Sequence, residues 1–263
     1  MEYGVCVISV LPVRAEPDHR SEMVNQLLFG EQFTVIEENN GWQHIEGALD
    51  GYIGWITSGT ALPLDKAPLR GNPEPSEIIS QPMRVSPITS PQSSYLVLPG
   101  SSLPGLNTSN GEFSLGGVKY QAHGSFMEKK ESCTPEKLAQ TAVLFLNAPY
   151  LWGGRSLFGI DCSGLVQVVY KICGIALPRD AGQQVMRGET RSFTSEAMPG
   201  DLAFFANPGE EISHVGMILD HEHIIHASGK VRIDKFDHQG IYQKEQENYS
   251  HSLRVIHKYL PGS

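Results

Sequence analysis

The sequence Gly159-Ile160-Asp161-Cys162-Ser163-Gly164-Leu165-Val166 places a cysteine between an acid and a hydroxyl, directly before an apolar-periodic segment. Apolar residues recur at three- and four-residue steps, at Leu165, Val166, Val169, Tyr170 and Cys173. This spacing, with Gly174 as a stop, predicts an amphipathic helix that carries Cys162 in its first turn. Free amide N–H groups and the positive end of the helix dipole stabilise a thiolate there, so we expect the pKa of Cys162 to fall. The thiolate is the reactive form, which makes Cys162 a candidate nucleophile.

The composition indicates a protein with a hydrophobic core and an acidic surface that does not attract polyanions. The chain has 263 residues, of which 40% are hydrophobic and 19% charged, and its formal net charge is −9. An acidic surface repels phosphate backbones and anionic lipids, so neither nucleic acid nor a membrane is an expected partner. No apolar run approaches the roughly 20 residues of a membrane span, and residues 1–5 lack the features of a leader. We expect a cytoplasmic location, or a periplasmic or secreted one if a leader has been removed.

Residues 1–63 contain short β-branched and aromatic runs separated by turn residues, which predicts a small β-barrel. The pairs Gly30-Glu31 and Gly41-Trp42 and the run Gly51-Tyr52-Ile53-Gly54-Trp55-Ile56 resemble a bacterial SH3-type domain. Prolines make residues 64–76 a linker. Residues 77–126 again show strand patterns, among them Met83-Arg84-Val85, and predict a second SH3-like barrel that leans on its neighbours.

Residues 132–260 change in character. Thr134-Pro135 predicts a helix start, and Asn147-Ala148-Pro149 its end. The aromatic turn at residues 150–155 leads to the cysteine, and it is expected either beside the cysteine-bearing helix or in the core. A short helix after Leu177-Pro178-Arg179-Asp180 precedes strand-like segments at residues 202–205, 214–219, 224–228 and 253–257. Helices followed by a run of antiparallel strands predict an α+β architecture.

Two histidines lie in adjoining strand-like segments and could serve the thiol, which needs a base and a group that orients that base. A three-residue loop at Asp220-His221-Glu222 would pair Gly216 with His226 and place His214 and His226 on the same face. A two-residue loop would separate the rings. We expect His214 to take the proton of Cys162 and His226 to hold the His214 ring.

We expect neither a metal nor another cofactor. A histidine-rich metal site at residues 214–226 is conceivable, but no carboxylate or cysteine nearby has ligand spacing. The four cysteines are irregularly spaced, so they indicate neither a zinc ribbon nor a disulfide scaffold.

Five motifs in order carry a family resemblance: Asp161-Cys162-Ser163-Gly164-Leu165-Val166, Leu177-Pro178-Arg179-Asp180, Pro199-Gly200-Asp201-Leu202, His214-Val215-Gly216 and Ile225-His226-Ala227. Together they resemble the NlpC-type papain-like cysteine peptidases, which cut peptidoglycan peptides. The resemblance covers roughly residues 134–258. It implies Cys162 as nucleophile, His214 as base and His226 as the third polar member. The implied fold is a helix bearing the cysteine packed on an antiparallel sheet.

With the SH3-type barrels in front, the arrangement resembles the γ-D-glutamyl-L-diamino acid endopeptidases of the dipeptidyl-peptidase VI type. These recycle murein peptides by cutting between γ-D-Glu and the diamino acid when the N-terminal L-Ala is free. The resemblance implies that Tyr52 and Asp161 contact the free amine, with Ser163 beside them and Glu31 also facing it. A buried ammonium needs a paired carboxylate, which agrees with this selectivity. One departure is Ala181-Gly182, where some relatives place a serine near the substrate.

Three alternatives stay open. The chain could be a secreted hydrolase whose SH3-type barrels bind intact peptidoglycan. It could also be a wall-binding protein without catalysis, which the joint presence of Cys162, His214 and His226 argues against. The same three residues could perform amidase or acyl-transfer chemistry on another amide. The sequence leaves open whether the diamino acid is meso-diaminopimelate or lysine.

Overall fold

The computed structural model describes residues 2–68, 70–71, 79–82, 85–124, 126–127 and 133–260. Residues 69 and 72–76 of the predicted linker, and Met83 and Arg84 of the predicted strand, lie outside these residues. The chain forms two compact units. One comprises Met1–Glu131, Trp152–Leu157 and Gly174–Ala176, and the other Ser132–Leu151, Phe158–Cys173 and Leu177–Ser263. None of the described helices has the length and apolar character that crossing a membrane requires.

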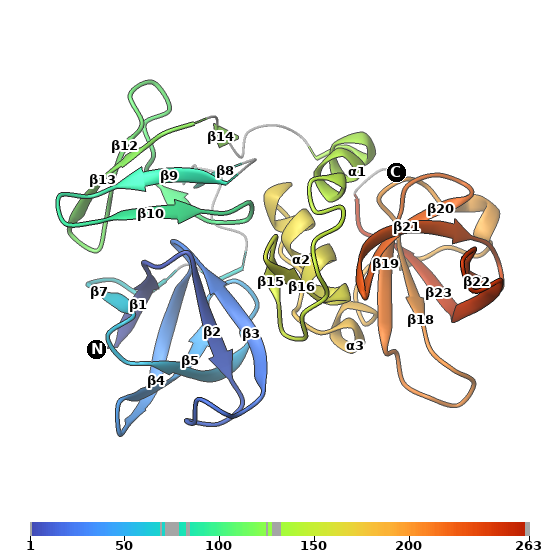
Figure 1. The fold of residues 1–263 in the computed structure, drawn as a ribbon, viewed down its shortest axis with the longest axis horizontal. Coiled ribbons are helices and arrows are strands. Elements are labelled where there is room, and N and C mark those ends of the chain that lie inside the picture. The colour runs from blue at the N-terminus through green and yellow to red at the C-terminus, as the bar shows by residue number, and fades with distance from the viewer. Residues whose placement is uncertain are drawn as a thin grey trace. The chain divides into compact units, whose positions relative to one another are not determined.

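The first unit begins with a seven-stranded antiparallel sheet in the order β3-β2-β6-β5-β4-β1-β7, drawn in blue to cyan in Figure 1. Its strands are β1 (Tyr3–Cys6), β2 (Val10–Arg14), β3 (Met23–Leu28), β4 (Gln32–Asn39), β5 (Trp42–Gly47), β6 (Ile53–Thr57) and β7 (Ala61–Leu64). Alternate residues point inward and close a core of Cys6, Leu11, Val13, Leu27, Phe33, Ile45 and Ile56. The short strands and the Gly and Asn turns of the sequence therefore form the predicted SH3-like barrel.

The same unit contains a four-stranded sheet, β10-β9-β13-β12, and a three-stranded sheet, β11-β8-β14. Their strands are β8 (Ile79–Pro82), β9 (Ser86–Thr89), β10 (Ser94–Val97), β11 (Leu103–Pro104), β12 (Glu112–Leu115), β13 (Val118–Ala122) and β14 (Phe126–Met127). This region leans on the first barrel as predicted, because Val5 and Phe29 belong to its buried cluster. Gly30, at φ 79°, permits the contact, since a Cβ there would lie 1.7 Å from the carbonyl oxygen of Ser102.

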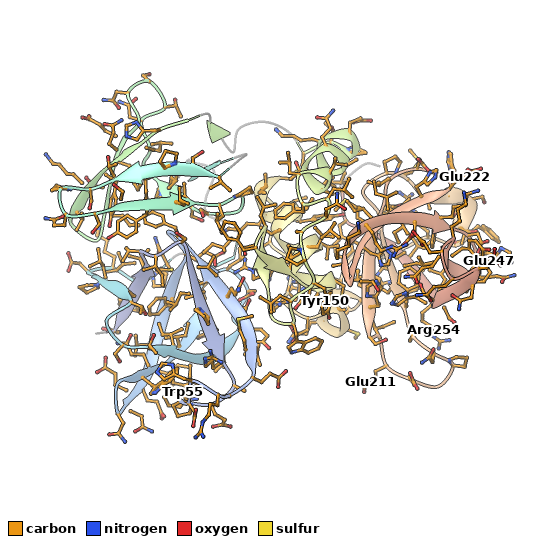
Figure 2. All side chains as sticks on the ribbon, in the orientation of Figure 1. Trp55, Tyr150, Glu211, Glu222, Glu247 and Arg254 are labelled. Carbon is orange, nitrogen blue, oxygen red and sulfur yellow. The ribbon has the colours of Figure 1, made fainter. Side chains whose placement is uncertain are left out.

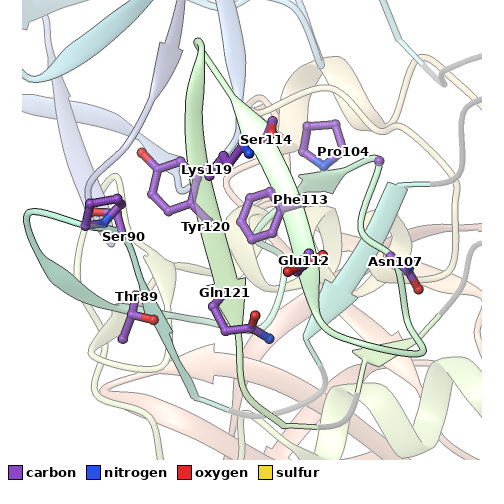
Figure 3. A pocket seen from close by; sticks show the side chains of 12 residues that line it. Thr89, Ser90, Pro104, Asn107, Glu112, Phe113, Ser114, Lys119, Tyr120 and Gln121 are labelled. Carbon is purple, nitrogen blue, oxygen red and sulfur yellow. The ribbon is translucent and has the colours of Figure 1, made fainter.

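A cavity of about 720 Å³ opens on this second region (Figure 3). It is lined by Thr89, Ser90, Pro91, Pro104, Gly105, Asn107, Glu112, Phe113, Ser114, Lys119, Tyr120 and Gln121. Its hydroxyl groups have no histidine beside them in the lining, and none of the predicted site residues belongs to it. A nucleophile without a base is a poor catalyst, so this cavity is not the candidate active site.

A buried ion pair ties the segment Trp152–Leu157 to the first barrel within the same unit. Arg155, in β15 (Arg155–Ser156), donates from its two terminal nitrogens to the two carboxylate oxygens of Glu31, at 2.8 and 2.9 Å. Arg155 is 1% and Glu31 5% exposed. Glu31 also accepts from the backbone N–H of Leu28 at 2.9 Å. The carboxylate predicted to face a substrate amine thus already has a buried cationic partner.

The second unit is built around a seven-stranded antiparallel sheet, β17-β23-β18-β19-β20-β21-β22, which curls so that β22 also pairs with β23 (orange to red in Figure 1). Its elements are α1 (Pro135–Val143), β16 (Gly159–Ile160), α2 (Cys162–Ile172), α3 (Ala181–Gln184), β17 (Glu189–Thr190), the 3₁₀-helix Thr194–Glu196, β18 (Leu202–Phe205), β19 (His214–Ile218), β20 (His223–Ser228), β21 (Lys230–Phe236), β22 (Gly240–Gln243) and β23 (Asn248–Lys258). Helix α2 packs on β19 and β20. Exposed acids such as Glu222 and Glu247 lie on the outside of the sheet (Figure 2). The predicted α+β fold, a cysteine-bearing helix on an antiparallel sheet, is confirmed.

The predicted end of the first helix is wrong by several residues. Thr134 caps its start as expected, but the helix ends at Val143 rather than at Asn147-Ala148-Pro149. Beyond Val143 the chain tightens, and Phe145 donates to the carbonyl of Ala142, three residues back, at 3.0 Å. Tighter bonds of this kind commonly finish a helix before a turn.

Removing one partner of the buried Glu31–Arg155 pair is expected to destabilise the first unit. Glu31→Ala leaves the guanidinium buried without its carboxylate, which should lower the free energy of unfolding by about 3–5 kcal/mol. Glu46→Ala, which breaks the exposed pair with Arg70, is the matched control and should cost less than about 1 kcal/mol. Urea unfolding followed by tryptophan fluorescence reports on this unit, because Trp42, Trp55 and Trp152 all lie in it. Equal losses in the two variants would contradict the importance of the buried pair.

Candidate active site

Cys162 is the first residue of α2, as the sequence predicts. Asp161 caps the helix by accepting from the backbone N–H of Gly164 at 2.7 Å. The cysteine is 7% exposed, and its sulfur accepts hydrogen bonds from the backbone of Ser163 and of Val215. Val215 directly follows His214 in β19, so the sulfur lies against the strand that carries the predicted base.

The acid before the cysteine is held by an arginine that the sequence analysis did not select. Arg179 donates to both oxygens of Asp161, at 3.0 and 2.6 Å, and to the hydroxyl of Ser163 at 2.8 Å. Asp161 and Arg179 are 4% and 2% exposed. The structure therefore brings Asp161, Cys162 and Ser163 together. The negative charge of Asp161 is matched by one buried guanidinium.

The two predicted histidines share one face of the sheet. β19 pairs with β20 so that Gly216 lies opposite His226 and Ile218 opposite Ile224, the register predicted from a three-residue loop. Nε2 of His214 and Nδ1 of His226 are 2.8 Å apart, and both rings are buried. Gly216 allows the two strands to approach this closely, since a Cβ there would lie 2.8 Å from Cδ1 of Ile224 and 3.0 Å from the Cβ of His226.

A carboxylate missed by the sequence analysis continues this chain. Nε2 of His226 is 2.9 Å from Oδ2 of Asp234 in β21, and Arg232 donates to both oxygens of Asp234 at 2.5 and 2.7 Å. His251 in β23 stacks on His214 with ring centroids 4.0 Å apart. In the sequence, Asp234 stands between Ile233 and Lys235 in a strand-like run. Its role can be recognised only once the structure shows that Asp234 is on the inward face of the strand.

The protonation of the site differs from the expectation for the thiol. Burial, followed by the negative charge of Asp161, raises the pKa of Cys162 to about 11, although the backbone of Val215 and Ser163 and the charge of Arg179 lower it. The predicted fall in the thiol pKa is therefore wrong, because loss of water outweighs the helix N-terminus. Burial, with the neighbouring imidazoles His226 and His251, lowers the pKa of His214 well below its usual value. At rest the thiol of Cys162 and the imidazole of His214 are therefore both neutral.

Two aromatic residues of the turn before the cysteine, Tyr150 and Trp152, have different surroundings. Tyr150, labelled in Figure 2, is 37% exposed, and partial burial followed by the negative charges of Cys162 and Asp161 raises its pKa to about 12. Its hydroxyl is therefore neutral. Trp152 is 59% exposed and donates to Glu22 at 2.5 Å, so it is not a core residue.

Three imidazoles could in principle hold a metal ion. One ring nitrogen from each of His214, His226 and His251 lies within 4.8 Å of the other two. However, both nitrogens of His226 are engaged, one with His214 and the other with Asp234. A metal ion would have to displace the His214–His226 hydrogen bond, so this arrangement suits proton transfer better than metal binding.

Comparison with known proteins agrees with this geometry. Residues 147–250 match the NlpC/P60 family, and residues 13–59 match the bacterial dipeptidyl-peptidase SH3 domain. The γ-D-glutamyl-L-lysine dipeptidyl-peptidase of Bacillus subtilis is 30% identical over 220 residues, covering 77% of this chain and 71% of that protein. The chain belongs to the NlpC/P60 family. It is a cysteine peptidase, as the sequence motifs indicated.

Two further proteins are similar to this NlpC/P60 chain over nearly its whole length. Dipeptidyl-peptidase 6 of Lysinibacillus sphaericus is 29% identical over 259 residues, covering 90% of this chain and 92% of that protein. The crystal structure of an NlpC/P60 family protein from Bacillus cereus superposes with a TM-score of 0.81 at 20% identity, covering 98% of this chain and all of the other. At that identity the superposition shows a shared fold.

Two predicted substrate-binding residues of this peptidase lie in the first barrel. Tyr52 precedes β6, and its backbone N–H donates to the side chain of Asp50 at 2.9 Å. Glu31 pairs with Arg155. Their contact with a substrate amine stays a prediction.

Acid is expected to destabilise the second unit. Burial, followed by His226, lowers the pKa of His251 to about 4, and the pKa of His214 is also lowered. Both rings stay neutral in the fold but take up a proton in the unfolded chain, so the free energy of unfolding falls as pH drops from about 6.5 towards 4. Urea unfolding followed by circular dichroism at several pH values measures this. His251→Phe keeps a stacked ring without a titrating nitrogen, so its decline should be smaller. An identical decline would contradict a contribution from His251.

Proposed function

We propose that this NlpC/P60 peptidase hydrolyses the bond between γ-D-Glu and the diamino acid in peptidoglycan-derived peptides with a free N-terminal L-Ala. The observation that carries the proposal is the similarity, over 77% of the chain, to a γ-D-glutamyl-L-lysine dipeptidyl-peptidase. The match to a dipeptidyl-peptidase SH3 domain supports it. A role in murein peptide recycling, and a cytoplasmic location, belong to the same proposal.

In the proposed mechanism, Cys162 is the nucleophile and His214 the base. Nε2 of His214 is engaged with His226, which leaves Nδ1 to take the thiol proton as sulfur attacks the scissile carbonyl. The backbone N–H of Cys162, at the start of α2, would donate to the developing oxyanion. His214 then protonates the leaving amine, and a water molecule, with His214 again as base, hydrolyses the thioester.

The physical support for amine recognition is the acid beside the nucleophile. Asp161 lies next to Cys162 in sequence and in space, and Ser163 is within the same network. Because Arg179 already pairs with Asp161, an incoming ammonium would have to share that carboxylate. The proposal assigns amine recognition to Asp161 together with Ser163, and the family resemblance adds Tyr52 and Glu31 to the proposed set.

The experiment compares L-Ala-γ-D-Glu-L-Lys with its N-acetylated form, and repeats the comparison with meso-diaminopimelate in place of lysine. We expect the free peptide to be cleaved about 100-fold faster, the value of one buried charged hydrogen bond. Cys162→Ala should abolish cleavage and leave the circular dichroism spectrum unchanged. Equal rates on the free and acetylated peptides would contradict amine recognition, and no cleavage of any peptide would contradict the substrate class.

A further inference from the structure

An ionised carboxylate occupies an inward position of β21 where an apolar residue is the norm. Asp234 is 8% exposed, whereas its neighbour Ile233 is 39% exposed. The apolar and charged residues are thus exchanged relative to the usual pattern of a half-buried strand. Burying a carboxylate is costly unless it is paired. Such breaks of local preference concentrate at functional sites.

The partners of Asp234 determine which of them carries a proton. Arg232 donates to both oxygens of the carboxylate and has no acceptor capacity. Burial raises the pKa of Asp234, but hydrogen bonds from His226 and Arg232 outweigh burial and lower it below its usual value. The carboxylate is therefore ionised and can only accept, so Nε2 of His226 must be the protonated nitrogen in the 2.9 Å contact.

Placing the proton of His226 on Nε2 also determines which nitrogen of His214 is protonated. In the form of His226 that carries one proton, on Nε2, the nitrogen Nδ1 has a lone pair and accepts from His214 across 2.8 Å. His214 must then carry its proton on Nε2. Its remaining nitrogen, Nδ1, bears a lone pair.

We propose that Asp234 is a positioning residue of this peptidase: through His226 it fixes the hydrogen-bond direction of both imidazoles and leaves Nδ1 of His214 free to accept the thiol proton. The inference rests on the proposed roles of Cys162 and His214. When the proton moves from sulfur to Nδ1, the S–H bond breaks and His214 becomes an imidazolium. The Nε2–H of His214 then donates to His226, which in turn donates to the carboxylate of Asp234. The negative charge of this carboxylate favours the thiolate–imidazolium ion pair. The other titratable groups around the rings are His251, stacked on His214, and Glu245, paired with Arg232 at 2.7 Å.

The variant Asp234→Asn reverses the chain. With the amide oxygen on Nη2 of Arg232, where Oδ1 lies, the amide NH₂ would take the place of Oδ2 and donate to Nε2 of His226. Each ring would shift its proton to the other nitrogen, and His214 would present an N–H to the sulfur. We expect kcat on the peptide substrate to fall at least about 100-fold, with KM changed less than about threefold, as for a base held in the wrong tautomer. Asp237→Asn removes the same charge three residues later, outside the relay, and should keep kcat within about twofold.

Two readouts need no substrate, so they separate this inference from the substrate proposal. Iodoacetamide labelling of Cys162 is followed on the tryptic peptide of residues 156–171, which contains no other cysteine. With wild type, thiol and imidazole share one proton internally, so the rate should be nearly constant between about pH 7 and 8.5. With Asp234→Asn the thiol must lose its proton to solvent, so the rate should rise about tenfold per pH unit.

The second readout uses wild type alone and does not depend on whether a variant folds. ¹⁵N-histidine NMR distinguishes protonated from bare ring nitrogens, and we expect Nε2–H in both His214 and His226. A proton on Nδ1 of either ring in the neutral protein would overturn the proposal. So would a folded Asp234→Asn enzyme with a flat labelling profile and kcat within about threefold of wild type.

Discussion

The hydrogen bond between Nε2 of His214 and Nδ1 of His226 is the contact on which the site depends. It exists because β19 and β20 pair with Gly216 opposite His226, and because Gly216 has no side chain to clash with Ile224 and with the Cβ of His226. A slip of one residue would turn one ring to the other side of the sheet. The register of β19 and β20 therefore determines whether the catalytic histidines can meet.

Buried carboxylates in this chain are repeatedly paired with arginine. Asp161 pairs with Arg179, Glu31 with Arg155, Asp234 with Arg232, and Asp201 with Arg191 at 2.8 Å. A planar guanidinium can satisfy both oxygens of a carboxylate at once, which limits the cost of removing the charge from water. Two of these pairs border the catalytic residues, so burial there serves orientation as well as stability.

The closed surroundings of the thiol have a chemical consequence. A cysteine at a helix start would be expected to ionise readily in water, but Cys162 is nearly inaccessible and its pKa is raised to about 11. His214 beside this thiol is neutral too, so neither member of the catalytic pair is charged at rest. Proton transfer within the pair keeps the total charge unchanged, which suits a poorly solvated site.

The sequence by itself determined the local elements of this protein: the helix start at Cys162, the antiparallel strands after it, and the odd loop that places His214 and His226 together. These follow from short-range spacing, capping and strand period, which neighbouring residues encode. Only the tertiary structure decided that the thiol is desolvated, that Arg179 holds Asp161, and that Asp234 stands behind His226. Desolvation and pairing depend on which surfaces close over a residue, and those surfaces come from chain segments far apart in sequence.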